Sequence, residues 1–186
     1  MRLFFILPVL FLLLRSSSAA QLPAVTKTAQ AEKHQQLSAG FSFPTGSFAA
    51  THYPGITLSY NRNYGTERTA SGARKRKSRW FSAAALSHFT GRKEAAGNGR
   101  FRYYGYSLLG LQGGIDWYPL KKTTLSFGTG PALGYYNNTL RFSLTGTVQG
   151  HYPLGKKTNI TPGISFIKES GSDALWVTSV QLGFIF

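Results

Sequence analysis

Apolar and polar side chains alternate along most of the chain, and residues 139–153 show the pattern at its clearest. The apolar members of this segment are Leu140, Phe142, Leu144, Val148 and Tyr152. A period of two places successive side chains on opposite faces of a β-strand. The segment is longer than the usual strand of a soluble domain, and its length suits a tilted strand that crosses a bilayer.

The same period returns at intervals and predicts eight strands. They span residues 37–44, 54–62, 79–90, 102–118, 123–135, 139–153, 159–169 and 173–186. No helical periodicity competes over comparable lengths. The glycines inside these segments would each weaken a helix by about 1 kcal/mol. The predicted fold class is therefore all-β, with antiparallel strands joined by turns.

The first 20 residues follow a different pattern. Arg2 precedes an apolar run from Leu3 to Leu14, and small residues suited to cleavage follow up to Ala20. The run is shorter than the roughly 20 residues that a membrane-spanning helix needs. We expect residues 1–20 to be an export signal peptide, with an N-terminal anchor as the alternative. Residues 21–36 are then a polar lead, and residues 37–186 form a single domain.

The apolar face of each strand can be covered in two ways. Two sheets can pack face to face in a sandwich, or one closed sheet can turn its apolar face to lipid. The long strands and their small polar opposite faces favour an eight-stranded antiparallel transmembrane up-and-down β-barrel, filled inside by side chains. The last predicted strand agrees, because its apolar face would be an exposed edge unless it paired with the first strand. That face carries Val180, Leu182, Phe184 and Phe186.

Two connections between predicted strands share one sequence pattern, "WYPLKKTTL" and "HYPLGKKTNI". Each has a Tyr-Pro-Leu followed by a pair of lysines. Proline cannot continue a strand ladder, so each strand is predicted to end there. Tyr118 and Tyr152 are predicted to be aromatic residues at the membrane–water interface, with the lysines just beyond it.

With these features the chain resembles the small eight-stranded outer-membrane β-barrels of Gram-negative bacteria. The resemblance rests on the signal peptide, the terminal "LGFIF", the two "YPL…KK" turns and "FSFPTGSF". It implies location in the cell outer membrane, among its lipids. It also implies that Val180, Leu182, Phe184 and Phe186 form the signal presented to the barrel-assembly machinery. It implies little about activity, since such barrels include adhesins, anchors, small pores and a few enzymes.

The parity of the strands predicts a topology. If Phe186 lies on the periplasmic side, turns 118–123 and 153–158 lie there too, and loops near 44–54, 91–100, 136–138 and 169–173 face outward. The long basic segment 61–79 then falls on the periplasmic side, where turns are normally short.

The net charge of the chain indicates which kinds of partner it is expected to bind. The chain has 21 Lys and Arg against 6 Asp and Glu, a formal net charge of +15. For an exported protein, lipopolysaccharide phosphates and anionic headgroups are the expected counterparts, and nucleic acid is not. The run from Arg74 to Arg79 is accordingly interpreted as a solvated loop. The candidate residues for contact with lipopolysaccharide or a host surface are Arg92, Lys93, Arg100 and Arg102. The chain is expected to be monomeric.

No constellation of catalytic, cofactor or metal-binding residues stands out in the sequence. The chain has no Cys, which excludes disulfides and Cys metal sites. "GHYPLGKKT" lacks the Ser or Thr that a P-loop needs after its Lys, and a strand is predicted to follow it. His88 and His151 are predicted to face the lumen, where a Ser–His–acid set could make a lipid hydrolase. Ser87, however, points away from His88.

Three charges fall inside predicted strands. A charge on the lipid face near the midplane costs roughly 2–4 kcal/mol, so Arg62, Arg141 and Asp116 are expected to face inward or lie near the interface. Arg141 is predicted to pair with an acid in the lumen, Asp116 or Glu169. We expect a non-enzymatic structural or surface-interaction role, without cofactors. The alternatives are a narrow pore for small solutes and a secreted or periplasmic β-sandwich binding module.

Overall fold

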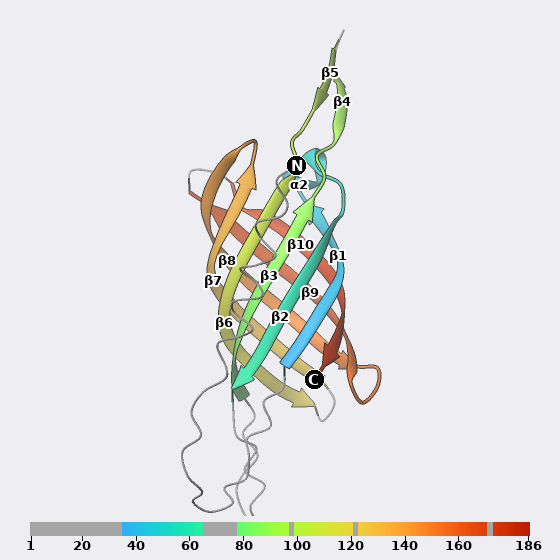
Figure 1. Ribbon diagram of the computed structural model, residues 1–186, viewed down its shortest axis with the longest axis vertical. Helices are drawn as coiled ribbons and strands as arrows, with labels where there is room; N and C mark the ends of the chain where they lie inside the picture. Colours follow the sequence, from blue (N-terminus) through green and yellow to red (C-terminus); the bar gives the residue numbers. More distant parts are fainter. Residues whose placement is uncertain (1–34, 65–77, 97–98, 121–122, 171–172) are drawn as a thin grey trace, which may run out of the picture. The chain divides into compact units, whose positions relative to one another are not determined.

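The computed structural model describes residues 35–64, 78–96, 99–120, 123–170 and 173–186, and it contains a closed barrel (Figure 1). The barrel strands are β1 (Gln35–Thr45), β2 (Gly55–Tyr64), β3 (Ser78–Phe89), β6 (Tyr106–Leu120), β7 (Thr123–Tyr136), β8 (Thr139–Pro153), β9 (Thr158–Glu169) and β10 (Leu175–Ile185). Their order is β1-β10-β9-β8-β7-β6-β3-β2, with antiparallel neighbours throughout. The predicted fold and strand count are confirmed. The predicted signal peptide lies outside the described residues.

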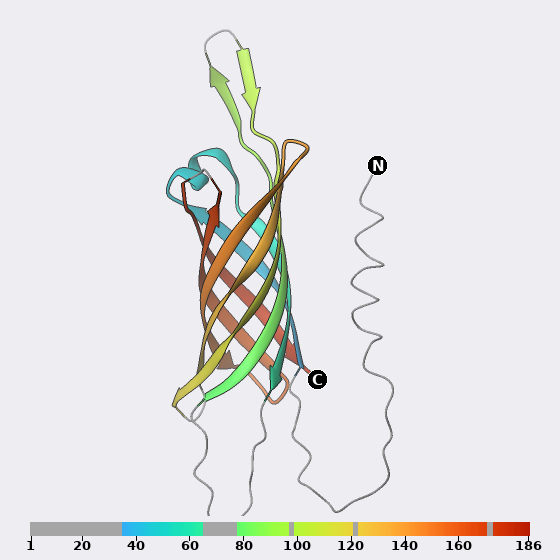
Figure 2. The ribbon, with the colours of Figure 1, turned by 90° about the vertical axis from the view of Figure 1, so that its left-hand side faces the viewer.

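Three short elements lie at one end of the barrel, opposite the end that carries Phe186 (Figure 2). They are the helix α2 (Ser47–Thr51) and the paired strands β4 (Lys93–Ala96) and β5 (Gly99–Arg102). We call this the helix end, and the opposite end the C-terminal end. The predicted strand 102–118 starts later than expected, at Tyr106, because residues 99–102 pair with β4 instead. Among the described residues, no helix has the length and apolar character to cross a membrane.

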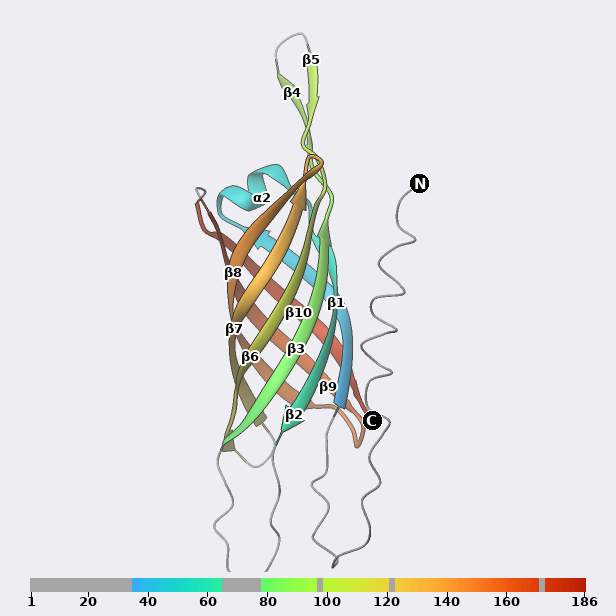
Figure 3. The same ribbon diagram turned by 60° about the vertical axis from the view of Figure 1, so that its left-hand side comes forward.

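The first and last barrel strands close the sheet side by side (Figure 3). Their register runs from Gln36 opposite Ile185 to Thr45 opposite Trp176. The backbone bonds continue beyond β10, where Phe186 N–H donates to the Gln35 carbonyl at 2.9 Å and Gln35 N–H donates to the Phe186 carbonyl at 3.3 Å. The edge of the terminal strand is therefore paired, as predicted.

The outward face of the barrel is an apolar belt. Phe142 is 76% exposed, whereas Gln181, on an inward position, is only 3% exposed. Val180, Leu182, Phe184 and Phe186 are all exposed on the outer face, as predicted. A continuous apolar surface of this kind needs hydrocarbon to cover it, and the inward polar residues rule out a sandwich with an apolar core.

The faces of β3 are reversed relative to the prediction from sequence. Trp80 is exposed on the outer face, while Phe81 is buried in the lumen. The lumen has room for the Phe81 ring because Gly114 and Gly128 lie beneath it. A Cβ added at these two glycines would come within 2.7 Å and 2.9 Å of ring carbons. The same parity turns His88 outward, so its predicted lumen position is wrong.

One of the two predicted interfacial aromatics is also misplaced. Tyr152 is exposed on the outer face, in agreement with the prediction. Tyr118 lies on the lumen side of β6, because it follows the buried Asp116 by two positions. Trp117 takes the outward position in its place. The strand also continues to Leu120 through a register shift, which lets the chain pass the proline without a regular ladder pair.

A charge placed on the apolar belt should destabilise the barrel only where it lies deep in the bilayer. Val148 lies near the middle of β8 between two exposed apolar neighbours, Phe127 and Ile164. We predict that Val148→Arg lowers the free energy of unfolding by about 2–4 kcal/mol, whereas Leu140→Arg, at the strand end, costs about 1 kcal/mol or less. Urea unfolding in lipid vesicles, followed by Trp fluorescence, measures both. Equal costs at the two positions would contradict the assignment of the belt.

Candidate functional site

An apolar plug closes the lumen at the helix end. Phe48 of α2 is 4% exposed and packs edge-on against Phe89 and Tyr106, with ring centroids 5.1 Å and 5.6 Å apart. The other buried members of this cluster are Leu108, Ala132, Ile167 and Val177. The plug was not predicted, since a five-residue helix inside a loop gives no periodic signal.

His52 fastens the loop that follows α2. Its Nε2 donates to the Tyr104 carbonyl at 3.1 Å, and its Nδ1 lies 2.8 Å from the Thr51 hydroxyl. Arg92 Nε donates to the His52 carbonyl at 3.2 Å, with its guanidinium 5.1 Å from the ring centre of Tyr53. Burial lowers the pKa of His52 below its ordinary value of 6.5, although the bond to Tyr104 opposes this shift.

Arg141 forms the ion pair at this end, but not with Asp116. Its Nη1 lies 3.3 Å from Glu169 Oε2, and Tyr106 Oη donates to Glu169 Oε1 at 2.7 Å. Arg141 is half exposed at the rim, whereas the Glu169 carboxylate is buried. The predicted Arg141–Asp116 pair is wrong, and the alternative acid, Glu169, is the partner.

The distance along the barrel explains that correction. Asp116 is in register with Ser126 of β7, whereas Arg141 is in register with Gly134 of the same strand. Eight residues of β7 separate the two levels, which is about 26 Å at roughly 3.3 Å per residue. Arg62, expected to face inward or lie near the interface, lies on the outer face two residues before the end of β2, with its guanidinium 5.4 Å from the ring centre of Tyr64.

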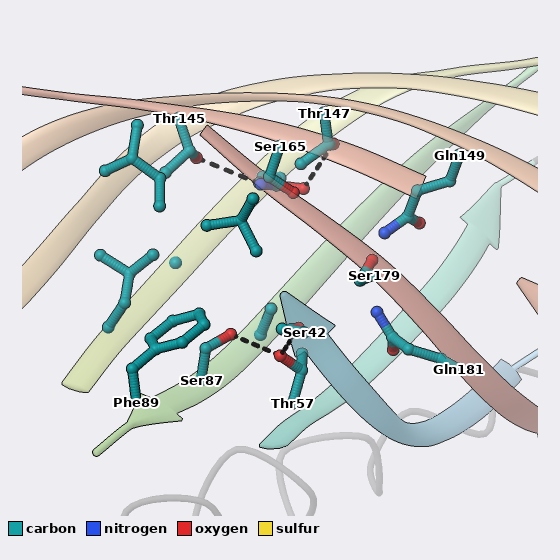
Figure 4. Close-up of a pocket in the computed structure, with 16 residues that line it drawn as sticks. Ser42, Thr57, Ser87, Phe89, Thr145, Thr147, Gln149, Ser165, Ser179 and Gln181 are labelled. Carbon is teal, nitrogen blue, oxygen red and sulfur yellow. Dashed lines mark hydrogen bonds between the residues drawn. The ribbon is translucent and has the colours of Figure 1, made fainter. Parts of the chain in front are cut away.

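Polar side chains fill the middle of the lumen (Figure 4). Gln112 reaches across β7 to Thr145 and Thr147, at 3.1 Å and 3.0 Å. On the other wall, the Thr57 hydroxyl bonds Ser42 at 2.5 Å and Ser87 at 2.8 Å. These groups surround a cavity of about 50 Å³. The middle of the barrel is therefore packed, as predicted, with small hydrogen-bonded side chains.

A Ser–His–acid set does occur in the lumen, but its order is unsuited to a hydrolase. The Ser126 hydroxyl donates to Asp116 and also lies 2.8 Å from His151 Nε2. The other ring nitrogen, Nδ1, lies 3.1 Å from the Thr161 hydroxyl. In a catalytic triad the imidazole stands between serine and acid, whereas here serine stands between the two. Asp116 and Ser126 are also buried away from the lipid face.

A second Ser–His pair faces outward. His88 Nδ1 lies 2.9 Å from the Ser107 hydroxyl, across the register of β3 and β6. Sequence reasoning missed this pair because its members are 19 residues apart and the face of β3 was reversed. Within the described part of the chain, no carboxylate bonds the His88 ring to orient it as a general base.

A larger cavity of about 270 Å³ lies at the C-terminal end of the lumen. Its polar lining includes Asn61, Asn63, Asn159, Arg79 and Asp116, and Tyr118 contributes an aromatic ring. We call it the Asn-lined cavity. None of these asparagines was a candidate from sequence, because a lumen-facing Asn is typical of any polar strand face. Among the described residues, no group of three or more His, Asp or Glu side chains is arranged to hold a metal ion.

The basic candidates gather at the helix end. Lys93 of β4 stands directly opposite Arg102 of β5, and Arg100 is in register with Ala95. Lys93, Phe101, Arg102 and Tyr104 are all exposed. Lys93 and Arg102 form no ion pair with any side chain that the structure describes. We call residues 92–104 the basic hairpin.

Comparisons with known proteins show which solved structures share this fold. No protein-family model matches the sequence, and no curated protein matches it. The attachment invasion locus protein Ail of Yersinia pestis, crystallised with the heparin analogue sucrose octasulfate, matches with a TM-score of 0.55 at 9% identity, over 83% of this chain and 99% of that chain. The N-terminal β-barrel domain of OprF from Pseudomonas aeruginosa matches with a TM-score of 0.52 at 10% identity, over 84% and 100%.

These likenesses and the apolar belt define the class of the protein. The chain has the fold of the small eight-stranded outer-membrane β-barrels of Gram-negative bacteria, as the sequence resemblance implied. The apolar belt of this chain agrees with the predicted location in the cell outer membrane. At identities this low, the structural similarity supports the fold alone.

Acid should loosen the plug through His52. Because the pKa of His52 is lowered in the closed form, the opened form binds the proton more tightly, and acidification through the ordinary value of 6.5 favours opening. We predict that amide exchange at His52 and Tyr53, bonded to the Phe48 and Thr90 carbonyls, speeds up between about pH 8 and about pH 5 beyond the intrinsic pH effect. In His52→Gln this extra change should vanish. Equal protection of wild type at both pH values would refute the role of His52.

Proposed function

We propose that the protein is an integral outer-membrane barrel that contacts anionic saccharides through the basic hairpin, without enzymatic activity. The ligand chemistry is a saccharide that carries sulfate or phosphate groups, supplied either by lipopolysaccharide or by a host glycan. The observation that carries the proposal is the pair of cations, Lys93 and Arg102, held opposite each other on β4 and β5.

Like charges directly opposite on a two-stranded sheet repel each other, so the pair destabilises the free hairpin. An anionic group between the two cations would turn this repulsion into attraction. Tyr104, two positions after Arg102, is exposed. Phe101 is exposed on the opposite face of the hairpin from the two cations, with its ring centre 5.0 Å from that of Tyr103. Arg92, at the base of the hairpin, is held in place by the His52 carbonyl.

The comparison with Ail supports this ligand class. Ail has the same fold and was crystallised with the heparin analogue sucrose octasulfate, which carries eight sulfate groups. The low identity means that no contact residue carries over, so the proposal depends on the hairpin of this chain. The predicted topology supports it as well, since it places residues 91–100 on the outer side of the membrane.

The proposal assigns no chemistry to the two Ser–His pairs. Ser126 and His151 are inside the lumen in an order unsuited to nucleophilic catalysis, and His88 lacks an orienting carboxylate among the described residues. A Ser–His pair without that third group is a weak base–nucleophile arrangement.

Binding should depend on the hairpin and on salt. We predict that Lys93→Gln combined with Arg102→Gln weakens binding to immobilised heparin or to lipopolysaccharide roughly five- to thirtyfold, at about 0.5–1 kcal/mol per charge. Surface plasmon resonance at two salt concentrations measures this loss. Lys156→Gln combined with Lys157→Gln, in the turn between β8 and β9, removes the same charge at the other end and should leave binding unchanged.

Comparing heparin with lipopolysaccharide distinguishes the two sources. Binding to heparin but not to lipopolysaccharide indicates a host glycan, and the reverse indicates the bacterial lipid. If the Lys156 and Lys157 variant loses as much affinity as the hairpin variant, binding follows net charge and the proposal is wrong.

The alternative of a narrow pore is not favoured by the lumen. The apolar plug and the Gln112 network both lie across the path of a solute. We predict that the protein in liposomes allows no more swelling in small sugars than protein-free liposomes do, with a sixteen-stranded porin as the positive control. Swelling above background, proportional to the amount of protein, would establish a pore instead.

A further inference from the structure

Arg62 is a cation on the lipid-facing surface of the barrel. It lies two residues before the end of β2, and its outward position alternates with Asn61 and Asn63, which line the Asn-lined cavity in the lumen. On the outer faces of β1, β2 and β3, which the structure describes in full, it is the only Lys or Arg. A charge at this surface needs an explanation, because hydrocarbon offers it neither water nor a counter-ion.

Aromatic side chains place Arg62 at the border of the apolar belt. Gln35, which stands opposite Arg62 in the register of β1 and β2, also pairs with Phe186, the last residue of the chain. Trp80 and Trp117 are exposed on the outer face, close to the same end of the barrel. Exposed tryptophans and tyrosines gather at membrane–water interfaces, so the Arg62 guanidinium lies at the depth of the lipid headgroups.

Polar side chains flank Arg62 on this outer face. Tyr60 Oη donates to Gln35 Oε1 at 2.9 Å, and Tyr64 Oη lies 3.0 Å from the Ser82 hydroxyl. Gln35 and Ser82 stand opposite Arg62 on the two neighbouring strands. The Arg62 guanidinium is 5.4 Å from the ring centre of Tyr64, within the range of a cation–π contact. We call these five residues the Arg62 patch.

The patch lacks an anion. Among the described residues, no carboxylate forms an ion pair with Arg62. Its Nε is buried without a hydrogen-bond partner, so an approaching anion meets the two terminal nitrogens of the partly exposed side chain. These nitrogens carry most of the N–H donors of a guanidinium, in a fork that fits two oxygens of a phosphate or a carboxylate.

The depth of the patch selects the kind of anion. A dissolved anion would have to give up water to reach a side chain on the lipid face, whereas the phosphate of a lipid is held at that depth by its own acyl chains. Leu37 and Leu58 are exposed on the same face, further from the strand ends, and offer apolar surface to such a chain. The predicted topology puts this end of the barrel on the periplasmic side, where phospholipid rather than lipopolysaccharide surrounds it.

We propose that the Arg62 patch binds an anionic phospholipid, whose phosphate accepts hydrogen bonds from the terminal nitrogens of Arg62 and whose acyl chain lies over Leu58 and Leu37. The strongly basic composition of the chain favours a headgroup with a net negative charge over a zwitterionic one. The site is at the opposite end of the barrel from the basic hairpin and takes a lipid instead of a glycan. Its test therefore does not depend on the proposed function.

Trp80 reports on lipid at this site, because it stands directly opposite Tyr64, which contacts the Arg62 guanidinium. The full-length protein, with Trp117→Phe and Trp176→Phe so that Trp80 is its only tryptophan, is reconstituted in vesicles that mix phosphatidylcholine with phosphatidylglycerol. In one series the phosphatidylglycerol carries bromine on its acyl chains, and in a second series the phosphatidylcholine does. Bromine quenches nearby tryptophan fluorescence, so the two series give the relative affinity of the site for the two lipids.

We expect the site to prefer phosphatidylglycerol over phosphatidylcholine about three- to tenfold. Arg62→Gln should bring this ratio close to one, and Arg62→Lys, which keeps the charge but loses the fork, should give an intermediate ratio. Lys156→Gln removes the same charge from the turn between β8 and β9, three strands away from β2, and should leave the ratio unchanged. A heat-modifiable gel shift verifies folding, and Arg62→Lys serves if Arg62→Gln does not fold.

Three outcomes would overturn the proposal. Equal affinity of the parent protein for the two lipids, or an undiminished preference in a folded Arg62 variant, means that the patch does not select the headgroup. A loss in Lys156→Gln as large as in Arg62→Gln means that the preference follows net charge. Inorganic phosphate is compared with sodium chloride at the same ionic strength, and a loss of preference in phosphate alone means that the patch binds the free anion instead of a lipid.

Discussion

Hydrocarbon offers no partner to a peptide group, so each backbone N–H and C=O of a lipid-facing strand must bond to another strand. The rest of this structure depends on that constraint. The pairing of β1 with β10, continued by Phe186 and Gln35, removes the two edges that an open eight-stranded sheet would present. With the edges gone, most large apolar side chains of the strands lie on the outer surface, and most of their polar side chains face the narrow lumen.

A narrow lumen makes glycine as important as the side chains that fill it. Gly114 and Gly128 provide the space that Phe81 occupies, and Gly128 also lies beneath the Gln112 amide that reaches Thr147. A large inward residue on one strand thus fits only because the next two strands carry glycine beside it. The result is a lumen in three zones: an apolar plug, a hydrogen-bonded middle and a hydrophilic cavity.

The sequence predicted the parts of the fold in which period and chemistry agree. In β8 and β10 the outward positions other than Gly146, Gly150 and Thr178 are apolar or aromatic, so the faces of these strands were assigned correctly. In β3 the adjacent Trp80 and Phe81 and the run Ala83 to Ala85 suit either parity, and only pairing with β2 and β6 decides between them. Asn137 and Asn138, both with positive φ, form the turn between β7 and β8, where a loop was predicted near residues 136–138. The site could not be predicted in the same way, because register between distant strands decides which charges meet, as it did for Arg141 and Glu169.

The opposed cations of the basic hairpin have a consequence for how the protein responds to its surroundings. An isolated pair of short strands is marginally stable in water, and the repulsion between Lys93 and Arg102 lowers that stability further. Dissolved ions weaken this repulsion, and they weaken the pull on an anionic partner as well. Screening thus orders the hairpin while it loosens the complex. The measured steepness of salt dependence would then understate the number of cations that touch the ligand.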